Sequence, residues 1–145
     1  MMIRKFFASA ITLGLAACGQ QVSEPTQTVD ESSVIMDQVV EGTVIATGVF
    51  EGASKHVTTG GVTIQQAEDG FYLVLEEDFS LDGAPAPRLG FGNPDYMIET
   101  QFSELKSKTG YQLYKLPEGL DPTSYQTIYV WCEQFKVPLG VATLG

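Results

Sequence analysis

The sequence has little histidine, little cysteine and few basic residues. One His and two Cys occur among 145 residues, so the usual donors of a zinc site are too scarce to favour one. Neither Cys-x-x-Cys nor Cys-x-x-Cys-His occurs, which excludes a thioredoxin-like dithiol and covalent c-type haem. Gly-x-Ser-x-Gly, the P-loop and the dinucleotide fingerprint are also absent. The residues therefore form no recognisable catalytic constellation, and the sequence does not identify an enzyme.

The N-terminus has the composition of an export signal. A basic head, Met-Met-Ile-Arg-Lys, precedes an apolar run over residues 6–17. Such a run is roughly 18 Å long as a helix, short of a hydrocarbon core of about 30 Å. The pattern is typical of a secretory signal peptide, predicted here over residues 1–17.

The end of the apolar run points to lipid attachment. Leu15-Ala16-Ala17-Cys18 resembles the lipobox of bacterial lipoproteins. That resemblance implies cleavage before Cys18, which becomes a lipid-modified N-terminus anchored in a membrane of the cell envelope by several acyl chains. Gly19 follows, where an Asp would favour the inner membrane, so the resemblance favours the outer membrane, with the domain facing the periplasm or the surface. The alternative is an ordinary signal peptide with a chance cysteine.

The segment that follows the predicted signal peptide and the net charge of the chain indicate how the domain is attached and which partners it repels. Residues 18–39 are polar and without apolar periodicity, which predicts a flexible tether. The chain holds 8 basic and 18 acidic residues. Cleavage after residue 17 would remove Arg4 and Lys5, so the mature chain would hold 6 basic and 18 acidic residues and carry a net charge of −12. Because such a surface repels phosphate groups, we expect no nucleic-acid partner.

Residues 40–145 have the pattern of one all-β domain. About 105 residues suffice for one core. Runs rich in Val, Ile, Thr, Tyr and Phe alternate with Gly, Asp and Pro turn signals, which predicts an antiparallel β-sandwich or small barrel of short strands. The predicted strands cover residues 42–51, 61–67, 71–76, 88–92, 111–116, 126–132 and 140–144.

At most one short helix is expected in this domain. Ile98, Phe102 and Leu105 fall at i, i+4 and i+7 and favour a helix over residues 97–108, although a strand and a turn would fit equally well. Asp121 followed by Pro122 predicts a single capped turn.

Cys132 is the residue whose chemistry matters most. If Cys18 carries lipid, Cys132 is an unpaired thiol in an oxidising compartment. Strand alternation places it with Ile128 and Val130 on the core face, which indicates a buried hydrophobe. The adjacent Glu133 and the acidic domain also disfavour a thiolate. The residues alone leave two hypotheses open for Cys132, a buried inert thiol or an exposed reactive thiol.

A family resemblance covers the domain from about residue 42 to residue 144. The C-terminal third carries it most clearly, in the motif positions Gly110, Gln112, Tyr114, Pro117, Tyr125, Trp131, Cys132, Phe135, Val137, Gly140, Ala142 and Leu144. The N-terminal half agrees at Gly48, Phe50, His56, Val57, Gly60, Val62, Ile64 and the stretch from Leu73 to Phe79. These positions resemble the DM-thirteen domain, a family usually labelled electron transfer.

The resemblance implies a redox role for Cys132, with Trp131, Phe135, His56 and Tyr114 as supporting positions. It also shows one departure. The family typically has Gly-Pro-Asp where this chain has Ala84-Pro85-Ala86, so any role of that Asp is lost here.

Three hypotheses follow. In the first, Cys132 is the centre of a redox or electron-transfer module, which needs a periplasmic or surface partner because a single thiol has no resolving cysteine. In the second, the domain is a non-catalytic binding module and Cys132 is a buried structural residue. In the third and weakest, His56 and Cys132 contact a haem or a metal. No other cofactor is evident.

Overall fold

The computed structural model describes residues 40–145, which belong to one compact unit. The predicted signal peptide, the lipidation site at Cys18 and the tether over residues 18–39 lie outside the described residues. In the described part of the chain, no helix has the length and hydrophobicity needed to cross a membrane.

Within residues 40–145 the chain forms ten strands and two 3-10 turns. The strands are β1 (Thr43–Gly52), β2 (Thr58–Thr59), β3 (Gly61–Ala67), β4 (Gly70–Leu75), β5 (Ser80–Leu81), β6 (Pro87–Gly92), β7 (Ser103–Glu104), β8 (Gln112–Lys115), β9 (Thr127–Cys132) and β10 (Val137–Thr143). The 3-10 turns are η1 (Ile98–Thr100) and η2 (Pro122–Ser124).

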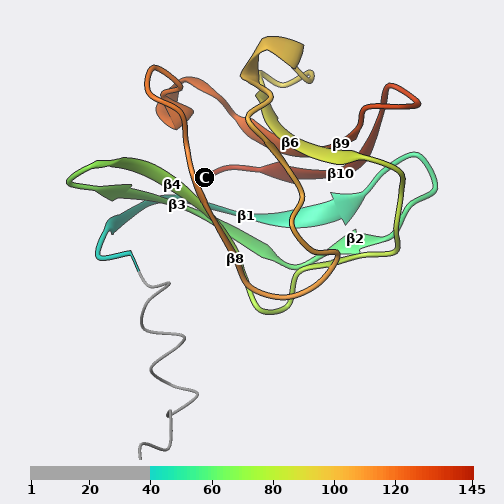
Figure 1. Cartoon of the computed structure of the whole chain (residues 1–145), viewed down its shortest axis with the longest axis horizontal. Helices are drawn as coiled ribbons and strands as arrows, with labels where there is room; N and C mark the ends of the chain where they lie inside the picture. Colours follow the sequence, from blue (N-terminus) through green and yellow to red (C-terminus); the bar gives the residue numbers. More distant parts are fainter. Residues whose placement is uncertain (1–39) are drawn as a thin grey trace, which may run out of the picture. The chain divides into compact units, whose positions relative to one another are not determined.

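Eight strands form one antiparallel sheet that curves into a nearly closed barrel. Their order is β7-β6-β9-β10-β1-β3-β4-β8, and β2 and β5 form a separate pair. Figure 1 shows β6, β9 and β10 on one side of the core and β1, β3, β4 and β8 on the other. The prediction of an all-β small barrel or sandwich is confirmed.

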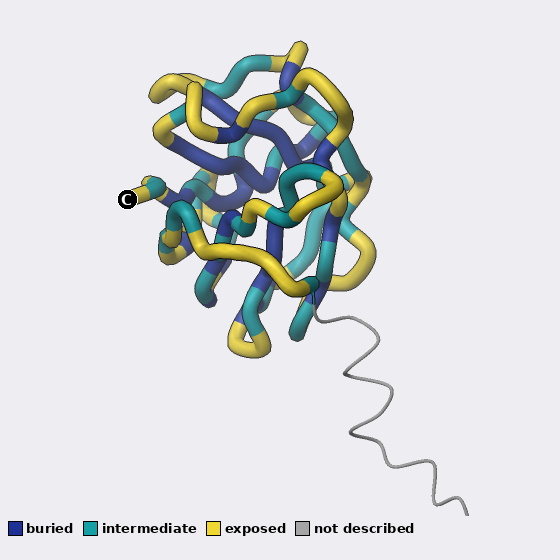
Figure 2. The backbone as a smooth tube through the Cα atoms, turned by 90° about the vertical axis from the view of Figure 1, so that its left-hand side faces the viewer, coloured by how far each residue is buried: buried dark blue, intermediate teal, exposed yellow. Residues whose placement is uncertain are grey.

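Alternating side chains explain why these segments pair around one core. In β3, Val62 and Ile64 are buried at two-residue spacing. In β9, Ile128, Val130 and Cys132 point inward as the alternation predicted. Figure 2 shows the buried segments of the tube gathered inside and the exposed ones at the loops.

The helix favoured over residues 97–108 is wrong, and the alternative of a strand and a turn is confirmed. Only Ile98–Thr100 forms a 3-10 turn, and Ser103–Glu104 is a strand. The backbone N–H groups of Phe102 and Leu105 donate to two carbonyl groups of β6, those of Leu89 and Pro87, at 3.0 and 2.9 Å. Pairing with an open strand edge therefore replaces helical hydrogen bonding here.

The capped turn predicted at residues 120–125 is confirmed. Asp121 lies at the N-cap of η2, its carboxylate accepts the backbone N–H of Thr123 at 2.9 Å, and Pro122 occupies the first position.

Side chains, rather than a strand ladder, join β8 to the segment after β7. The Tyr114 hydroxyl accepts the Lys106 N–H at 2.9 Å and donates to Gln112 Oε1 at 2.6 Å. Gln112 Oε1 also accepts the Ser107 N–H, and its Nε2 donates to the Ser107 carbonyl, both at 2.9 Å. Two positions of the family motif therefore hold the barrel closed along this seam.

We predict that Tyr114→Phe lowers the free energy of unfolding by about 1–3 kcal/mol, because it leaves the Lys106 N–H and a Gln112 lone pair without a partner in a buried site. Urea unfolding followed by the fluorescence of Trp131 measures the change. Tyr72→Phe is the control, because its hydroxyl donates to the exposed Asp69 carboxylate at the surface. Equal losses in the two variants would contradict the role of the seam.

Candidate functional site

Cys132 lies in the barrel wall with its side chain in the core. It is the last residue of β9 and pairs with Pro87 of β6 and Val137 of β10. Its exposed fraction is 1%, and it belongs to the main hydrophobic cluster. The thiol is therefore shielded from solvent in this conformation, in agreement with the alternation of β9.

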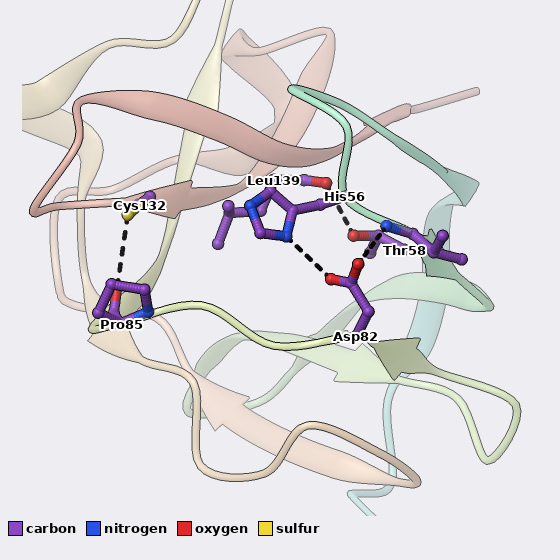
Figure 3. A network of polar contacts seen from close by, with 7 residues as sticks. His56, Thr58, Asp82, Pro85, Cys132 and Leu139 are labelled. Atoms are coloured by element: carbon purple, nitrogen blue, oxygen red, sulfur yellow. Dashed lines mark hydrogen bonds and ion pairs between the residues drawn. The ribbon is translucent and has the colours of Figure 1, made fainter.

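One short segment covers the thiol. Residues 82–86, named here the strap, run from β5 to β6, and Ala84 packs against the core. The Cys132 S–H donates to the Pro85 carbonyl at 3.5 Å, and the Glu133 N–H donates to the Ala86 carbonyl at 3.5 Å. Figure 3 shows Cys132 pointing toward Pro85. The N–H···O bond is long and a thiol is a weak donor, so the strap is held over the thiol weakly at this end.

The other end of the strap is tied to the loop between β1 and β2. Asp82 Oδ1 lies 2.9 Å from His56 Nδ1, and Oδ2 accepts the Val57 N–H at 3.0 Å. The Asp82 N–H also donates to the Val57 carbonyl at 3.0 Å. The Val57 N–H first, and His56 second, lower the pKa of Asp82 below its ordinary value. Figure 3 shows this anchor beside Thr58 and Leu139.

The lowered pKa of Asp82 predicts a pH dependence of stability. The anchor contributes fully above the unfolded pKa of an aspartate, about 4, and this contribution is lost as the pH falls through the lower folded value. We therefore expect Asp82→Asn to destabilise the domain at pH 6 and the difference from wild type to shrink below pH 4. Urea unfolding of wild type and Asp82→Asn at pH 6 and below pH 4 measures this difference in the free energy of unfolding. A difference that is unchanged or larger in acid would contradict the prediction.

His56 and Cys132 occupy opposite ends of the strap. The His56 ring is bonded to Asp82, whereas the Cys132 thiol is bonded to Pro85 (Figure 3). Among residues 40–145, three or more His, Cys, Asp or Glu side chains do not come together in a group that could hold a metal ion. The strap joins the two positions structurally; a shared haem or metal contact stays an untested hypothesis.

The other predicted supporting residues lie in three different parts of the barrel. Trp131 is half-buried, and strand alternation places it on the outer face of β9. Phe135 lies in the turn between β9 and β10 and is 63% exposed. Tyr114 is buried in the seam described above, and burial raises the pKa of its hydroxyl. Trp131 and Phe135 therefore lie outside the hydrophobic cluster that contains Cys132, whereas Tyr114 belongs to that cluster.

A second cluster, which the sequence did not predict, covers the outer face of β6 and β9. Tyr96 and Trp131 stack with ring centroids 4.1 Å apart and planes at 11°. Tyr129 meets the Tyr96 ring edge-on at 5.5 Å. Burial foremost, and the Glu133 carboxylate next, raise the pKa of Tyr96 to about 12. Tyr96 lies on a loop, where periodicity gives no signal.

A comparison with models of protein families identifies the family of this domain. The family model described as Electron transfer DM13 matches residues 50–144, and the chain therefore belongs to the DM13 family. Searches of curated proteins and of solved structures each returned no significant match. Membership of this family suggests a redox or electron-transfer type of role.

The departure from the family pattern falls in the strap. Ala86, at the position where the family typically has Asp, has a φ of 45°. Asp and Asn are several-fold enriched over Ala in this left-handed region. The family's Asp would thus suit the backbone at this position beside Cys132, independently of any chemistry.

Proposed function

We propose that this chain is a lipid-anchored protein of the bacterial cell envelope whose DM13 domain exchanges reducing equivalents with a periplasmic or surface partner through Cys132. The observation that carries the proposal is the family match over residues 50–144. Cys132, the one free thiol among residues 40–145, lies beneath a weakly held strap, which supports the proposal because such a thiol is protected at rest and needs only a local opening to react.

The reaction that fits a single thiol is thiol–disulfide exchange. After the strap opens, the Cys132 S–H loses its proton to water and the thiolate attacks a disulfide of the partner. The new bond joins Cys132 Sγ to one partner sulfur, and the other partner sulfur leaves as a thiolate. A second thiolate then cleaves the mixed disulfide and regenerates Cys132. The partner supplies all other sulfur atoms.

Trapping in cells tests the redox proposal. Cells are quenched with acid and a thiol-blocking reagent, and envelope proteins are separated without reductant. We expect a higher-mass adduct of the chain that reductant removes and that Cys132→Ala abolishes. Tyr72→Phe, which leaves the thiol and strap intact, is the control. An adduct pattern identical in wild type and Cys132→Ala would overturn the proposal.

Labelling tests the anchor separately. We expect wild type to incorporate labelled fatty acid and to sediment with outer membranes, whereas Cys18→Ser is unlabelled and leaves the membrane fraction. Incorporation that persists in Cys18→Ser would overturn lipidation at Cys18. Recovery of labelled wild type with inner membranes would overturn the outer-membrane assignment.

A second function is favoured by the burial of the thiol. A side chain that is 1% exposed and packed in the main cluster has the environment of a structural cysteine. In that case the domain is a non-catalytic binding module displayed on the envelope. Cys132→Ala with unchanged fold and unchanged cellular phenotype would favour this function over the redox one.

A further inference from the structure

A cavity of about 360 Å³ lies where β8 leads into the loop before η2. Apolar groups form part of its wall, namely Phe71 of β4 and, after β8, Leu116, Pro117 and Leu120. Leu116 is buried, whereas Phe71 and Leu120 are half-buried and pack against the core. The Leu116 N–H donates to the Phe71 carbonyl at 2.9 Å, which holds these two residues together. The cavity therefore has an apolar wall built on the core, and its volume is in the range of small-molecule sites.

This cavity, named here the β8 pocket, belongs to the opposite end of β9 from Cys132. The segment after β8 leads through η2 into the start of β9, whereas Cys132 is the last residue of β9. Figure 1 shows the segment between β8 and β9 on the left, near the β3–β4 hairpin, and the turn between β9 and β10 on the right. An inference from the β8 pocket therefore does not rest on the redox role proposed for Cys132.

The charged side chains that line the β8 pocket leave an excess of negative charge. They are Asp69, Lys115, Glu118 and Asp121, one positive and three negative charges, which gives a net −2. Lys115 and Asp69 bond to each other at 2.6 Å. Within residues 40–145, Glu118 forms no ion pair. The N–H and the hydroxyl of Thr123 both donate to Asp121 Oδ1, so Oδ2 can accept from a ligand.

We infer that the β8 pocket binds a small organic cation, in which a short flexible chain joins an aromatic ring to a protonated amine. The ring lies against Phe71, Leu116 and Leu120, where burial of its apolar surface is favourable. The ammonium group lies at the rim, where the carboxylates of Glu118 and Asp121 accept its N–H groups. The net charge of −10 on the chain adds to this preference for a cation.

An anion of the same shape lacks this match. The one cation of the pocket, Lys115, is already bonded to Asp69, and its Nζ also lies 5.7 Å from the centroid of the Tyr72 ring. A ligand carboxylate would have to compete with Asp69 for this ammonium group while facing Glu118 and Asp121. We therefore expect the anion to bind about tenfold more weakly than the cation at low ionic strength.

Titration with three indole compounds tests the inference. The ¹⁵N-labelled full chain carrying Cys18→Ser is titrated with tryptamine, with neutral 3-methylindole and with indole-3-propionate, and the backbone amides are followed by NMR. We expect tryptamine to shift the amides of residues 69–71 and 115–121 with a dissociation constant of about 1 mM. We expect indole-3-propionate to bind about tenfold more weakly, and salt at about 0.5 M to reduce this difference by screening.

Two double variants with the same change of charge test the rim. Glu118→Gln with Asp121→Asn removes the two rim charges, and Asn still suits the N-cap of η2. Glu51→Gln with Asp95→Asn removes two charges from exposed residues that do not line the pocket. We expect tryptamine to bind about tenfold more weakly to the first double variant than to the second. We expect 3-methylindole to bind equally to both.

Four results would each overturn the inference. They are the absence of amide shifts at millimolar tryptamine, shifts confined to residues outside the pocket, equal binding of tryptamine and indole-3-propionate to wild type, and equal binding of tryptamine to the two double variants. We expect Cys132→Ala to bind tryptamine as wild type does. Failure of thiol exchange and failure of the β8 pocket are therefore distinguishable.

Discussion

Replacement of Asp82 by Ala is expected to raise the rate at which a thiol reagent modifies Cys132 in the native protein by roughly tenfold. The substitution removes the bonds to His56 and to the Val57 N–H that tie down one end of the strap. Modification of a buried group proceeds through local opening, so its rate follows the population of the open state. Because the Asp82 carboxylate is partly solvated, we expect the loss of these two bonds to raise the population of the locally open state by about one order of magnitude.

Rates are measured with a maleimide on the full chain carrying Cys18→Ser. Glu118→Ala is the matched control, because it removes the same charge from an exposed loop away from the strap. Unfolding rates from Trp131 fluorescence show whether modification occurs without global unfolding. Equal modification rates in Asp82→Ala and Glu118→Ala would show that the strap does not control access to the thiol.

Gly140→Ala is expected to lower the free energy of unfolding by about 1–3 kcal/mol. A Cβ atom at Gly140 would lie 2.6 Å from Thr58 Cγ2 and 2.7 Å from Thr58 Cβ. Thr58 is 1% exposed and donates its hydroxyl to the Leu139 carbonyl at 2.8 Å, so turning away would break this bond and leave a buried hydroxyl unpaired. This contact explains why a glycine suits this family motif position in β10.

A double-mutant cycle separates this clash from a simple loss of strand propensity. Thr58→Gly removes all three atoms that the new methyl group would meet. We therefore expect the double variant to lose less free energy of unfolding than the two single variants together. The expected coupling energy, measured by urea unfolding, is about 0.5–3 kcal/mol. Strict additivity would mean that Thr58 is not the reason for Gly140.

The fold class could be predicted because period-two alternation survives in the long central strands. Gly61–Ala67 is a strand with the predicted bounds, and β9 differs from its predicted range by one residue. The helix over residues 97–108 failed for a physical reason. The spacing of Ile98, Phe102 and Leu105 was read as one helical face, but Ile98 is 56% exposed and the other two pack beside β6.

The site was predictable only in part. Alternation placed Cys132 in the core, and the family motif marked Trp131, Tyr114 and His56, but neither could show what each side chain contacts. The strap and the Tyr96 stack join residues distant in sequence; the Cys132–Pro85 bond, for example, spans 47 residues. Tertiary contacts of this kind leave no local periodicity for sequence reasoning to detect.

A redox role for Cys132 is tested most directly by the mass of the native full chain carrying Cys18→Ser after incubation with oxidised glutathione. We expect one glutathione adduct per chain, located on Cys132, formed without denaturant and removed by a reducing thiol. We also expect the adduct to form faster in Asp82→Ala than in Glu118→Ala. A native protein that stays unmodified until it is unfolded would contradict a redox role for Cys132 and leave it as a structural residue of the core.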